Sequence, residues 1–217
     1  MQEPLSILYT HNLRGDLAML PRLYTLLRQL RAQAQRFEDE DDVLVCALQP
    51  PARRTLLIDL GNSCAANVWH CAATGGRSTL ILLDAMGYDA AHVTRQLAPG
   101  AREKLVESVQ MVLVDGDHAY EQNGVQVTAA RQPGLAALQL VAQPDATARL
   151  DGRVLYPQAL EAGQVGVAHV SFRDGSPRLS GHDVFPLSPG TPPEPTIAGA
   201  VDFVLSEAKR YQAKQAR

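Results

Sequence analysis

Residues 7–17 read ILYTHNLRGDL, an apolar run that ends in a polar turn. The apolar residues at Leu5–Tyr9 predict a short buried strand, and the regular spacing of leucines after Asp16 predicts a helix over residues 16–35. Between these two elements stand a His, an Asn and an Arg, followed by a Gly. Because α/β proteins place their ligand sites at the carboxyl ends of strands, this turn is a candidate site of chemistry.

The alternation of strand and helix continues to about residue 93. We expect a solvated acidic turn at Glu38–Asp42, strands at Val43–Leu48 and Thr55–Leu60, a helix at Gly75–Met86, and a third parallel strand that begins near Asp89. This order of strands and helices predicts a parallel sheet with crossover helices.

The second half of the chain has a different sequence pattern. From about residue 108, short β-rich runs are separated by Gly, Pro and Asp, which predicts an antiparallel or mixed sheet. Residues 184–195 are rich in proline and predict a surface connector to a C-terminal helix over residues 196–212. The sequence has no internal repeat and no clean boundary, so we expect a single domain over residues 1–217.

Composition excludes several classes of protein. A net charge of −3 argues against a nucleic-acid binder, which normally carries a basic excess. No apolar run approaches the roughly 20 residues that a bilayer requires, and the first residues lack the pattern of a signal peptide. We therefore expect a cytoplasmic protein that binds neither nucleic acid nor membrane. The three cysteines, an odd number, fit reduced thiols better than a disulfide framework.

Four blocks of sequence resemble, in order, those of the calcineurin-like metallophosphoesterases, and in particular the catalytic domain of the 5′-nucleotidase branch. The blocks are ILYTHNLRG at 7–15, LLIDLGNS at 56–63, GGRSTLILLDAMGYDAAHVTRQ at 75–96 and EAGQVGVAHVSFRDG at 161–175. The resemblance implies an α/β fold, an αββα sandwich in which a parallel or mixed sheet packs on a second sheet between flanking helices. The stretch between the third and fourth blocks matches poorly and looks shortened.

The same resemblance implies that the metal ligands of the family are substituted. The family's Asp and His of the first turn fall on Asn12 and Arg14, its bridging Asp on Asn62, and its Asn-His pair on Arg95 and Gln96. Amide and guanidinium groups cannot replace the carboxylates that bridge two metal ions. We therefore expect a non-catalytic protein without a cofactor. It would act by binding a small anion or a nucleotide through Arg14 and Arg95, or by binding a protein partner. The alternative is that both arginines extend from surface loops into solvent.

Other functions stay open at this point. An active phosphoesterase with an unorthodox manganese or zinc site would use His11, His92, Asp117 or His118, although an ordinary polar turn also explains the last two. The string VLVDGDHAYEQNG resembles a segment of class I methyltransferases, but the chain lacks the repeated glycines of their cofactor loop. A shortened distal lobe would leave one face uncovered, so a homo-oligomer is a candidate assembly.

The cysteines also raise the question of a zinc site. Cys46, Cys64, His70 and Cys71 do not have the spacing of a paired C-x-x-C framework. We expect the stretch WHCAATGG at 69–76 to be a partly buried loop in which Cys acts as a small apolar residue. A nucleophilic Cys-His pair remains an alternative, although no neighbouring residue identifies a site that stabilises a thiolate.

Overall fold

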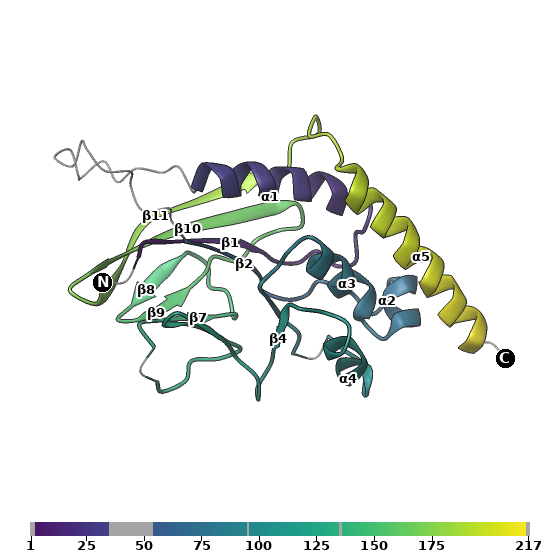
Figure 1. The fold of residues 1–217 in the computed structure, drawn as a ribbon, viewed down its shortest axis with the longest axis horizontal. Coiled ribbons are helices and arrows are strands. Elements are labelled where there is room, and N and C mark those ends of the chain that lie inside the picture. The colour runs from purple at the N-terminus through teal and green to yellow at the C-terminus, as the bar shows by residue number, and fades with distance from the viewer. Residues whose placement is uncertain (1–2, 35–53, 95, 135, 216–217) are drawn as a thin grey trace.

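The strands of the protein form two sheets. The computed structural model describes residues 3–34, 54–94, 96–134 and 136–215. The first sheet has the strand order β11-β10-β1-β2-β3-β4 (Figure 1). Its members are β1 (Leu5–Thr10), β2 (Arg54–Asp59), β3 (Ala90–His92), β4 (Val112–Val114), β10 (Gln164–Arg173) and β11 (Ser176–Pro186). Strands β1 to β4 are parallel, whereas β10 is antiparallel to both β1 and β11.

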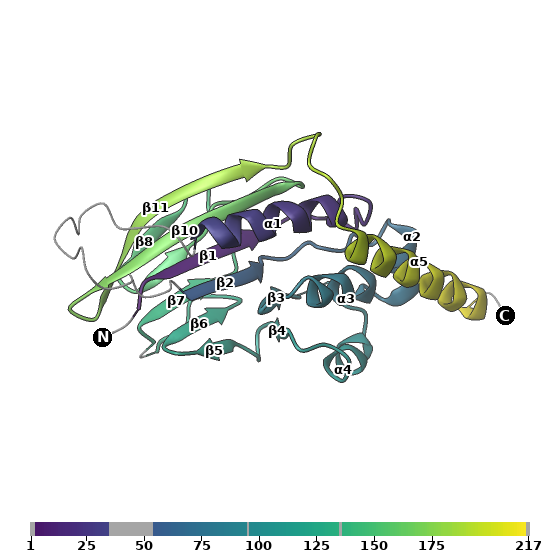
Figure 2. The ribbon, with the colours of Figure 1, turned by 45° about the horizontal axis from the view of Figure 1, so that its top comes forward.

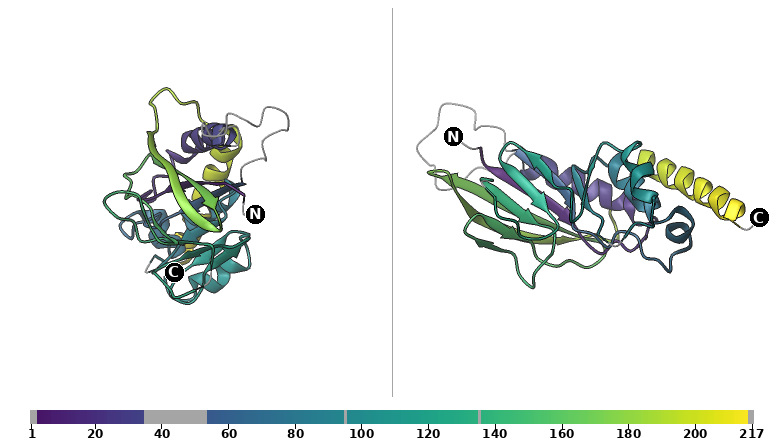
Figure 3. Two further views of the ribbon diagram at one scale, coloured as in Figure 1. Left: turned by 90° about the vertical axis from the view of Figure 1, so that its left-hand side faces the viewer. Right: turned by 90° about the horizontal axis from the view of Figure 1, so that it is seen from below.

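The second sheet contains the short strands that follow β4. Its order is β5-β6-β7-β9-β8, with parallel pairs in the middle and an antiparallel pair at each edge. The strands are β5 (Tyr120–Gln122), β6 (Val125–Thr128), β7 (Leu138–Val141), β8 (Arg149–Asp151) and β9 (Val154–Tyr156). Seen from one end of the molecule, helix α1 and this sheet lie on opposite sides of the first sheet (Figure 3).

Five helices complete the described part of the chain: α1 (Leu20–Ala34), α2 (Trp69–Thr74), α3 (Arg77–Ala85), α4 (Ala101–Val106) and α5 (Pro195–Gln215). Helices α1, α3 and α5 bury apolar residues against one face of the first sheet, and the second sheet packs on the other face. None of the helices in the described ranges is long and apolar enough to cross a membrane.

Strand β1 buries all six of its residues because both faces of its sheet are covered. Leu8 packs in the cluster beneath the helices, while Ile7 and Tyr9 pack between the two sheets. A strand covered on both sides is expected to be apolar without alternation, and this explains the run that opens the sequence. The expected fold class is confirmed: two mixed sheets pack together with flanking helices.

Several predicted boundaries need correction. The first helix begins at Leu20 and not at residue 16, because the Asp16 carboxylate accepts the Met19 backbone N–H (3.2 Å) and holds residues 16–19 in a turn. Strand β11 continues to Pro186, so the proline-rich connector spans residues 187–194 only. The predicted turn at 38–42 and strand at 43–48 lie outside the described residues.

Residues 69–76 are not the loop that the sequence suggested. Helix α2 occupies residues 69–74 and ends at Gly75, which adopts the left-handed conformation (φ 62°) that a glycine tolerates best. The Gly76 N–H then bonds the Cys71 carbonyl (2.8 Å), a typical way to satisfy a helix C-terminus. The glycine pair therefore ends one helix and starts the next, α3.

Candidate functional site

The carboxyl ends of β1, β2, β3 and β4 meet at one edge of the first sheet, because these strands are parallel and adjacent. Figure 2 shows β1 and β2 ending toward the part of the molecule that carries α2 and α3. The residues that follow the strands are His11 and Asn12 after β1, Asn62 after β2, and Asp115 after β4. In open α/β sheets this edge is where ligands bind.

Asn12 and Asn62 lie in direct contact at this edge. The Asn62 Nδ2 donates a hydrogen bond of 2.6 Å to Asn12 Oδ1, and Asn12 Nδ2 donates one of 2.8 Å to the Leu160 carbonyl. Both asparagines have positive φ angles, 59° and 56°. Asparagine tolerates this left-handed conformation better than most residues. The structure therefore brings together the positions that the resemblance assigned to two metal ligands.

The backbone fastens the two turns to each other. The N–H groups of Asn12, Arg14 and Gly15 donate in succession to the carbonyls of Gly61, Asn62 and Ser63, at 3.1, 3.0 and 2.7 Å.

The Arg14 side chain is exposed, and its guanidinium forms no ion pair within the described part of the chain. The backbone therefore fixes where the Arg14 side chain leaves the turn, and the guanidinium extends from there into solvent.

Gln96 joins the same cluster from the segment after β3. Its Oε1 accepts the Ser63 backbone N–H at 3.3 Å, next to Asn62. Its Nε2 is buried and has no hydrogen-bond partner among the described residues. Arg95, the other predicted cation, lies outside the described residues. Four of the five predicted positions, Asn12, Arg14, Asn62 and Gln96, are thus carried by two turns and one neighbouring segment.

The two histidines of this edge are suited to being neutral at pH 7. Burial lowers the pKa of His11 and of His92, against the effect of backbone hydrogen bonds to Leu160 and Leu60. His92 Nδ1–H donates to the Leu60 carbonyl (3.2 Å), and its Nε2 accepts the Thr94 hydroxyl (2.8 Å). His11 Nδ1 is buried without a partner among the described residues.

Asp115, Asp117 and His118 form a closed polar turn after β4. Asp115 Oδ1 accepts both backbone N–H groups of the other two residues and the His118 Nδ1–H (2.8–2.9 Å). Its Oδ2 accepts the Arg102 Nε–H at 2.8 Å. Partial burial raises the pKa of Asp115, but these hydrogen bonds outweigh it and lower the pKa to about 2. Both carboxylate oxygens are therefore occupied by groups of the turn and of α4.

A carboxylate that the sequence analysis missed lies directly beneath the site. Asp59, the last residue of β2, is fully buried and accepts hydrogen bonds from Ser63 Oγ, from the Gly61 N–H (3.0 Å) and from Thr10 Oγ1 (3.1 Å). Burial raises the pKa of Asp59 to about 7, although these three donors act to lower it. A single Asp within the apolar run LLIDLG is the signal that could have found it.

The residues at this edge do not fit a two-metal centre. Such a centre requires carboxylates that bridge and neutralise the ions. The Asp59 carboxylate is enclosed by three donors, and Asp115 is held by Arg102 and His118. In the described ranges, three metal-ligating side chains converge only at Cys64, His70 and Cys71.

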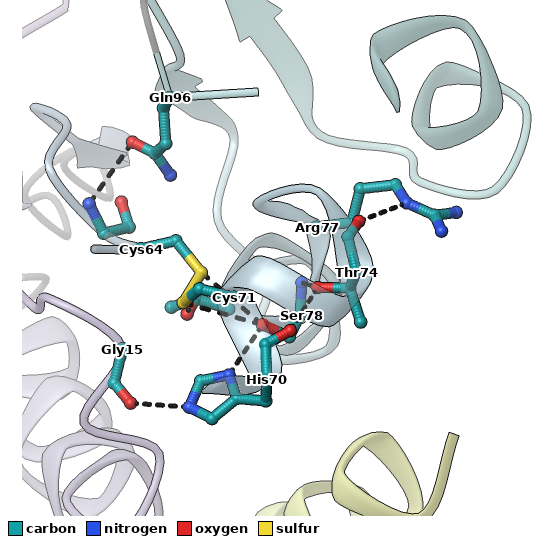
Figure 4. The surroundings of a disulfide bond; sticks show 10 residues. Gly15, Cys64, His70, Cys71, Thr74, Arg77, Ser78 and Gln96 are labelled. Carbon is teal, nitrogen blue, oxygen red and sulfur yellow. Dashed lines mark hydrogen bonds between the residues drawn. A yellow bond between two sulfur atoms is a disulfide. The ribbon is translucent and has the colours of Figure 1, made fainter. Parts of the chain in front are cut away.

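Those cysteines also correct an expectation. Cys64 and Cys71 are joined by a disulfide, so the prediction of reduced thiols is wrong for this pair (Figure 4). The seven-residue separation carries no motif, and the pairing arises because the turn after β2 lies against α2.

The layout of sheets and strand-end turns is that of the calcineurin-like phosphoesterase fold. The crystal structure of the calcineurin-like phosphoesterase YfkN from Bacillus subtilis superposes with a TM-score of 0.60 at 11% sequence identity, and the match covers 97% of this chain and 99% of that one. At this identity the likeness establishes the fold alone. No protein-family model and no curated protein sequence matches the chain.

The fold does not agree with the methyltransferase alternative. A doubly wound nucleotide-binding sheet places its first strand between two parallel neighbours. Here β1 lies between the parallel β2 and the antiparallel β10.

Proposed function

We propose that this protein is a non-catalytic relative of the calcineurin-like phosphoesterases that binds a small phosphorylated anion at the carboxyl edge of its first sheet. The observation that carries the proposal is the 2.6 Å hydrogen bond between the Asn62 and Asn12 side chains. Two ionised carboxylates facing each other at this distance would repel, and would need a metal cation or a shared proton between them. Two amides instead satisfy one another, so this contact needs no metal.

The charges at the edge support an anionic ligand. Arg14 is exposed and has no carboxylate partner in the described part of the chain. A guanidinium binds phosphate or carboxylate oxygens through paired hydrogen bonds. Gln96 Nε2 is a buried donor without a described partner, an arrangement that costs about 1–3 kcal/mol unless an acceptor satisfies it. A phosphate oxygen is such an acceptor.

The 5′-nucleotidase branch is the finer assignment that we propose for this chain. The tetrapeptide Gly87–Ala90, which resembles one in that branch, also holds the sheet together. The Tyr88 hydroxyl hydrogen-bonds Thr10 Oγ1 (3.0 Å), and Asp89 Oδ2 accepts the Leu57 N–H (2.7 Å). These contacts hold β1, β2 and the start of β3 together. The resemblance of this tetrapeptide to the one in the 5′-nucleotidase branch is what supports the finer assignment, and it makes a nucleotide phosphate the first ligand to test.

The binding test compares two arginine variants. Thermal unfolding of the wild type is expected to shift upward with phosphate or with adenosine monophosphate, because a ligand that binds only the folded state stabilises it. Arg14→Gln should lose most of this shift. Arg28→Gln is the matched control, because Arg28 is an exposed arginine on α1. A shift that is equal in both variants, or no shift with any anion, would contradict the proposed anion site.

The catalytic test is independent of the binding test. We expect no stoichiometric metal in the purified protein with its Cys64–Cys71 disulfide intact, and no hydrolysis of phosphomonoesters, phosphodiesters or nucleotides with added Mn²⁺. Metal-dependent turnover that follows the protein through purification would instead establish the active phosphoesterase with an unorthodox site. Asn12→Ala and Asn62→Ala would then show whether this edge carries the reaction.

A further inference from the structure

Cys64, His70 and Cys71 form a buried cluster of metal-ligating atoms that the proposed anion site does not use. Their Sγ and ring nitrogen atoms all lie within 4.8 Å of one another. Cys64 comes from the turn after β2, and the other two residues come from α2 (Figure 4). The Cα atoms of the two disulfide-bonded cysteines are 5.7 Å apart. Thiolate and imidazole are the ligands of protein zinc sites.

The hydrogen bonds of His70 define which ring nitrogen is free to ligate. Nε2 lies 3.0 Å from the Gly15 carbonyl, which can only accept, so Nε2 carries the proton. Nδ1 is then an acceptor, and it faces Ser78 Oγ at 2.8 Å. Burial lowers the pKa of His70, which favours the neutral ring that a metal requires. Metal-bound histidines commonly donate their other N–H to a carbonyl in this way.

The fourth polar atom of the cluster is Ser78 Oγ. It lies 3.4 Å from Cys64 Sγ and 3.9 Å from Cys71 Sγ, in addition to its contact with His70. A tetrahedral zinc ion with metal–sulfur bonds of about 2.3 Å separates its ligand atoms by roughly 3.4–3.8 Å. The two distances from Ser78 Oγ to the sulfurs are close to this range, and the ligand atoms of the two cysteines and the histidine lie within 4.8 Å of one another.

We propose that reduction of the Cys64–Cys71 disulfide converts this cluster into a zinc site. The ligands are the two thiolates and His70 Nδ1, with Ser78 or a water molecule at the fourth position. The site is closed in the oxidised protein because the disulfide sulfurs carry no thiolate charge and are bonded to each other, so they cannot occupy two separate ligand positions. This inference does not depend on the proposed anion binding.

The reaction balances with a dithiol as reductant. The dithiol transfers two electrons and two protons to the disulfide, breaks the S–S bond and becomes a disulfide itself. Zn²⁺ then displaces the two thiol protons to solvent, and the zinc–nitrogen bond replaces the hydrogen bond between Ser78 and His70. Zinc affinity is therefore expected to rise with pH, because ligand thiols must lose their protons.

The experiment titrates Zn²⁺ into the full chain, with the disulfide either intact or reduced by dithiothreitol and then freed of reductant without oxygen. A competing chromophoric chelator reports the affinity. We expect one tightly bound ion per reduced chain and none per oxidised chain. Co²⁺ as a second probe should give a thiolate-to-metal charge-transfer band in the reduced protein only. Reduced protein that binds no stoichiometric zinc, or oxidised protein that binds it equally, would overturn the proposal.

Variants identify the ligands. Cys46→Ser is the matched control. The proposal gives Cys46 no role, so this variant should bind zinc as the wild type does. In that background, Cys64→Ser and His70→Gln should each weaken zinc binding by more than the roughly 10- to 100-fold that loss of an outer-shell partner costs. Circular dichroism checks that each variant folds. If the variants do not fold, the comparison of oxidised and reduced Cys46→Ser protein decides alone. Loss of binding in Cys46→Ser itself, or loss of fold on reduction that zinc does not restore, would count against the site.

Discussion

Asn62 donates its side-chain amide to Asn12 across a distance of 2.6 Å, and this one contact joins the turns that follow two neighbouring parallel strands. In the fold that the chain shares with a calcineurin-like phosphoesterase, we propose that it replaces an ionic site by a neutral one.

Replacing both asparagines by aspartate should create a metal-dependent stability. The double variant Asn12→Asp/Asn62→Asp places two carboxylates where the two amides now form a hydrogen bond. Without metal, their repulsion should lower the melting temperature. Mn²⁺ at a hundredfold excess over its Kd should then stabilise the variant by about 2.7 kcal/mol, a rise of roughly 5–10 °C. Calorimetry with and without Mn²⁺ is the measurement. Asn123→Asp, at another positive-φ asparagine, is the control, and equal stabilisation of the wild type would contradict the argument.

Asp59 should make stability depend on pH. Its folded pKa of about 7 lies above its ordinary value of 3.8, because burial disfavours the charged form. Between these values the folded state holds a proton that the unfolded chain releases, so this contribution is present below pH 4 and is lost as pH rises to 7. The loss is at most about 4 kcal/mol, at about 1.36 kcal/mol per pKa unit.

Asp59→Asn isolates that contribution. The amide cannot titrate, and its oxygen can still accept from the Gly61 N–H that now bonds the carboxylate. The difference in free energy of unfolding between wild type and variant, measured in urea at pH 4.5, 6 and 8, should change in favour of the variant as pH rises. A difference that stays constant across this range would show that Asp59 does not carry a raised pKa.

Gly166→Ala should destabilise the protein by about 1–3 kcal/mol or more through overpacking. Gly166 on β10 pairs with Tyr9 on β1, and a Cβ atom there would overlap the phenol ring. That ring has no room to move, because it is fully buried and its hydroxyl bonds His182 Nε2 (2.7 Å). Gly181→Ala on β11 is the control, since its Cβ would meet only the His169 ring at an ordinary 3.6 Å. Equal chemical stability of the two variants would refute this account.

Reduction of the disulfide in metal-free buffer should cost about 2 kcal/mol. The bond closes a short loop, with seven residues of separation between Cys64 and Cys71. In the chain-entropy model a loop of this length stabilises the folded state by roughly that amount, which corresponds to about 4–8 °C in melting temperature. The midpoint of thermal unfolding with and without dithiothreitol measures it. An unchanged midpoint would mean that the bond contributes no stability to the native state.

The sequence predicted strands β1 and β2 and helices α1 and α5 well, because each of them keeps one pattern of burial along its whole length. Strand β1 is buried on both faces and reads as an unbroken apolar run. Helix α5 buries Ile197, Val201, Val204 and Ala208, which recur at helical spacing. The short helix α2 was missed because its six residues contain no periodic pattern, and its end depends on the backbone conformation of Gly75.

For the candidate site, the resemblance indicated which turns carry the candidate residues but not how their side chains meet. Asn12, Arg14, Asn62 and Gln96 are candidates because their blocks resemble those of the calcineurin-like metallophosphoesterases. Their contacts depend on the parallel pairing of β1 with β2, which no local pattern encodes. Asp59 escaped notice because a buried carboxylate looks like any other Asp until its donors are known.

By itself, the sequence determined which segments are apolar enough to form the first sheet and its covering helices, and which chemical groups stand at the strand ends. Only the tertiary structure decided the hydrogen bond between Asn12 and Asn62, the burial of Asp59 and the pairing of Cys64 with Cys71. The physical reason is that these contacts join residues of different structural elements. Periodicity reports the average environment of one segment, whereas each of these contacts depends on the distance between atoms from separate segments.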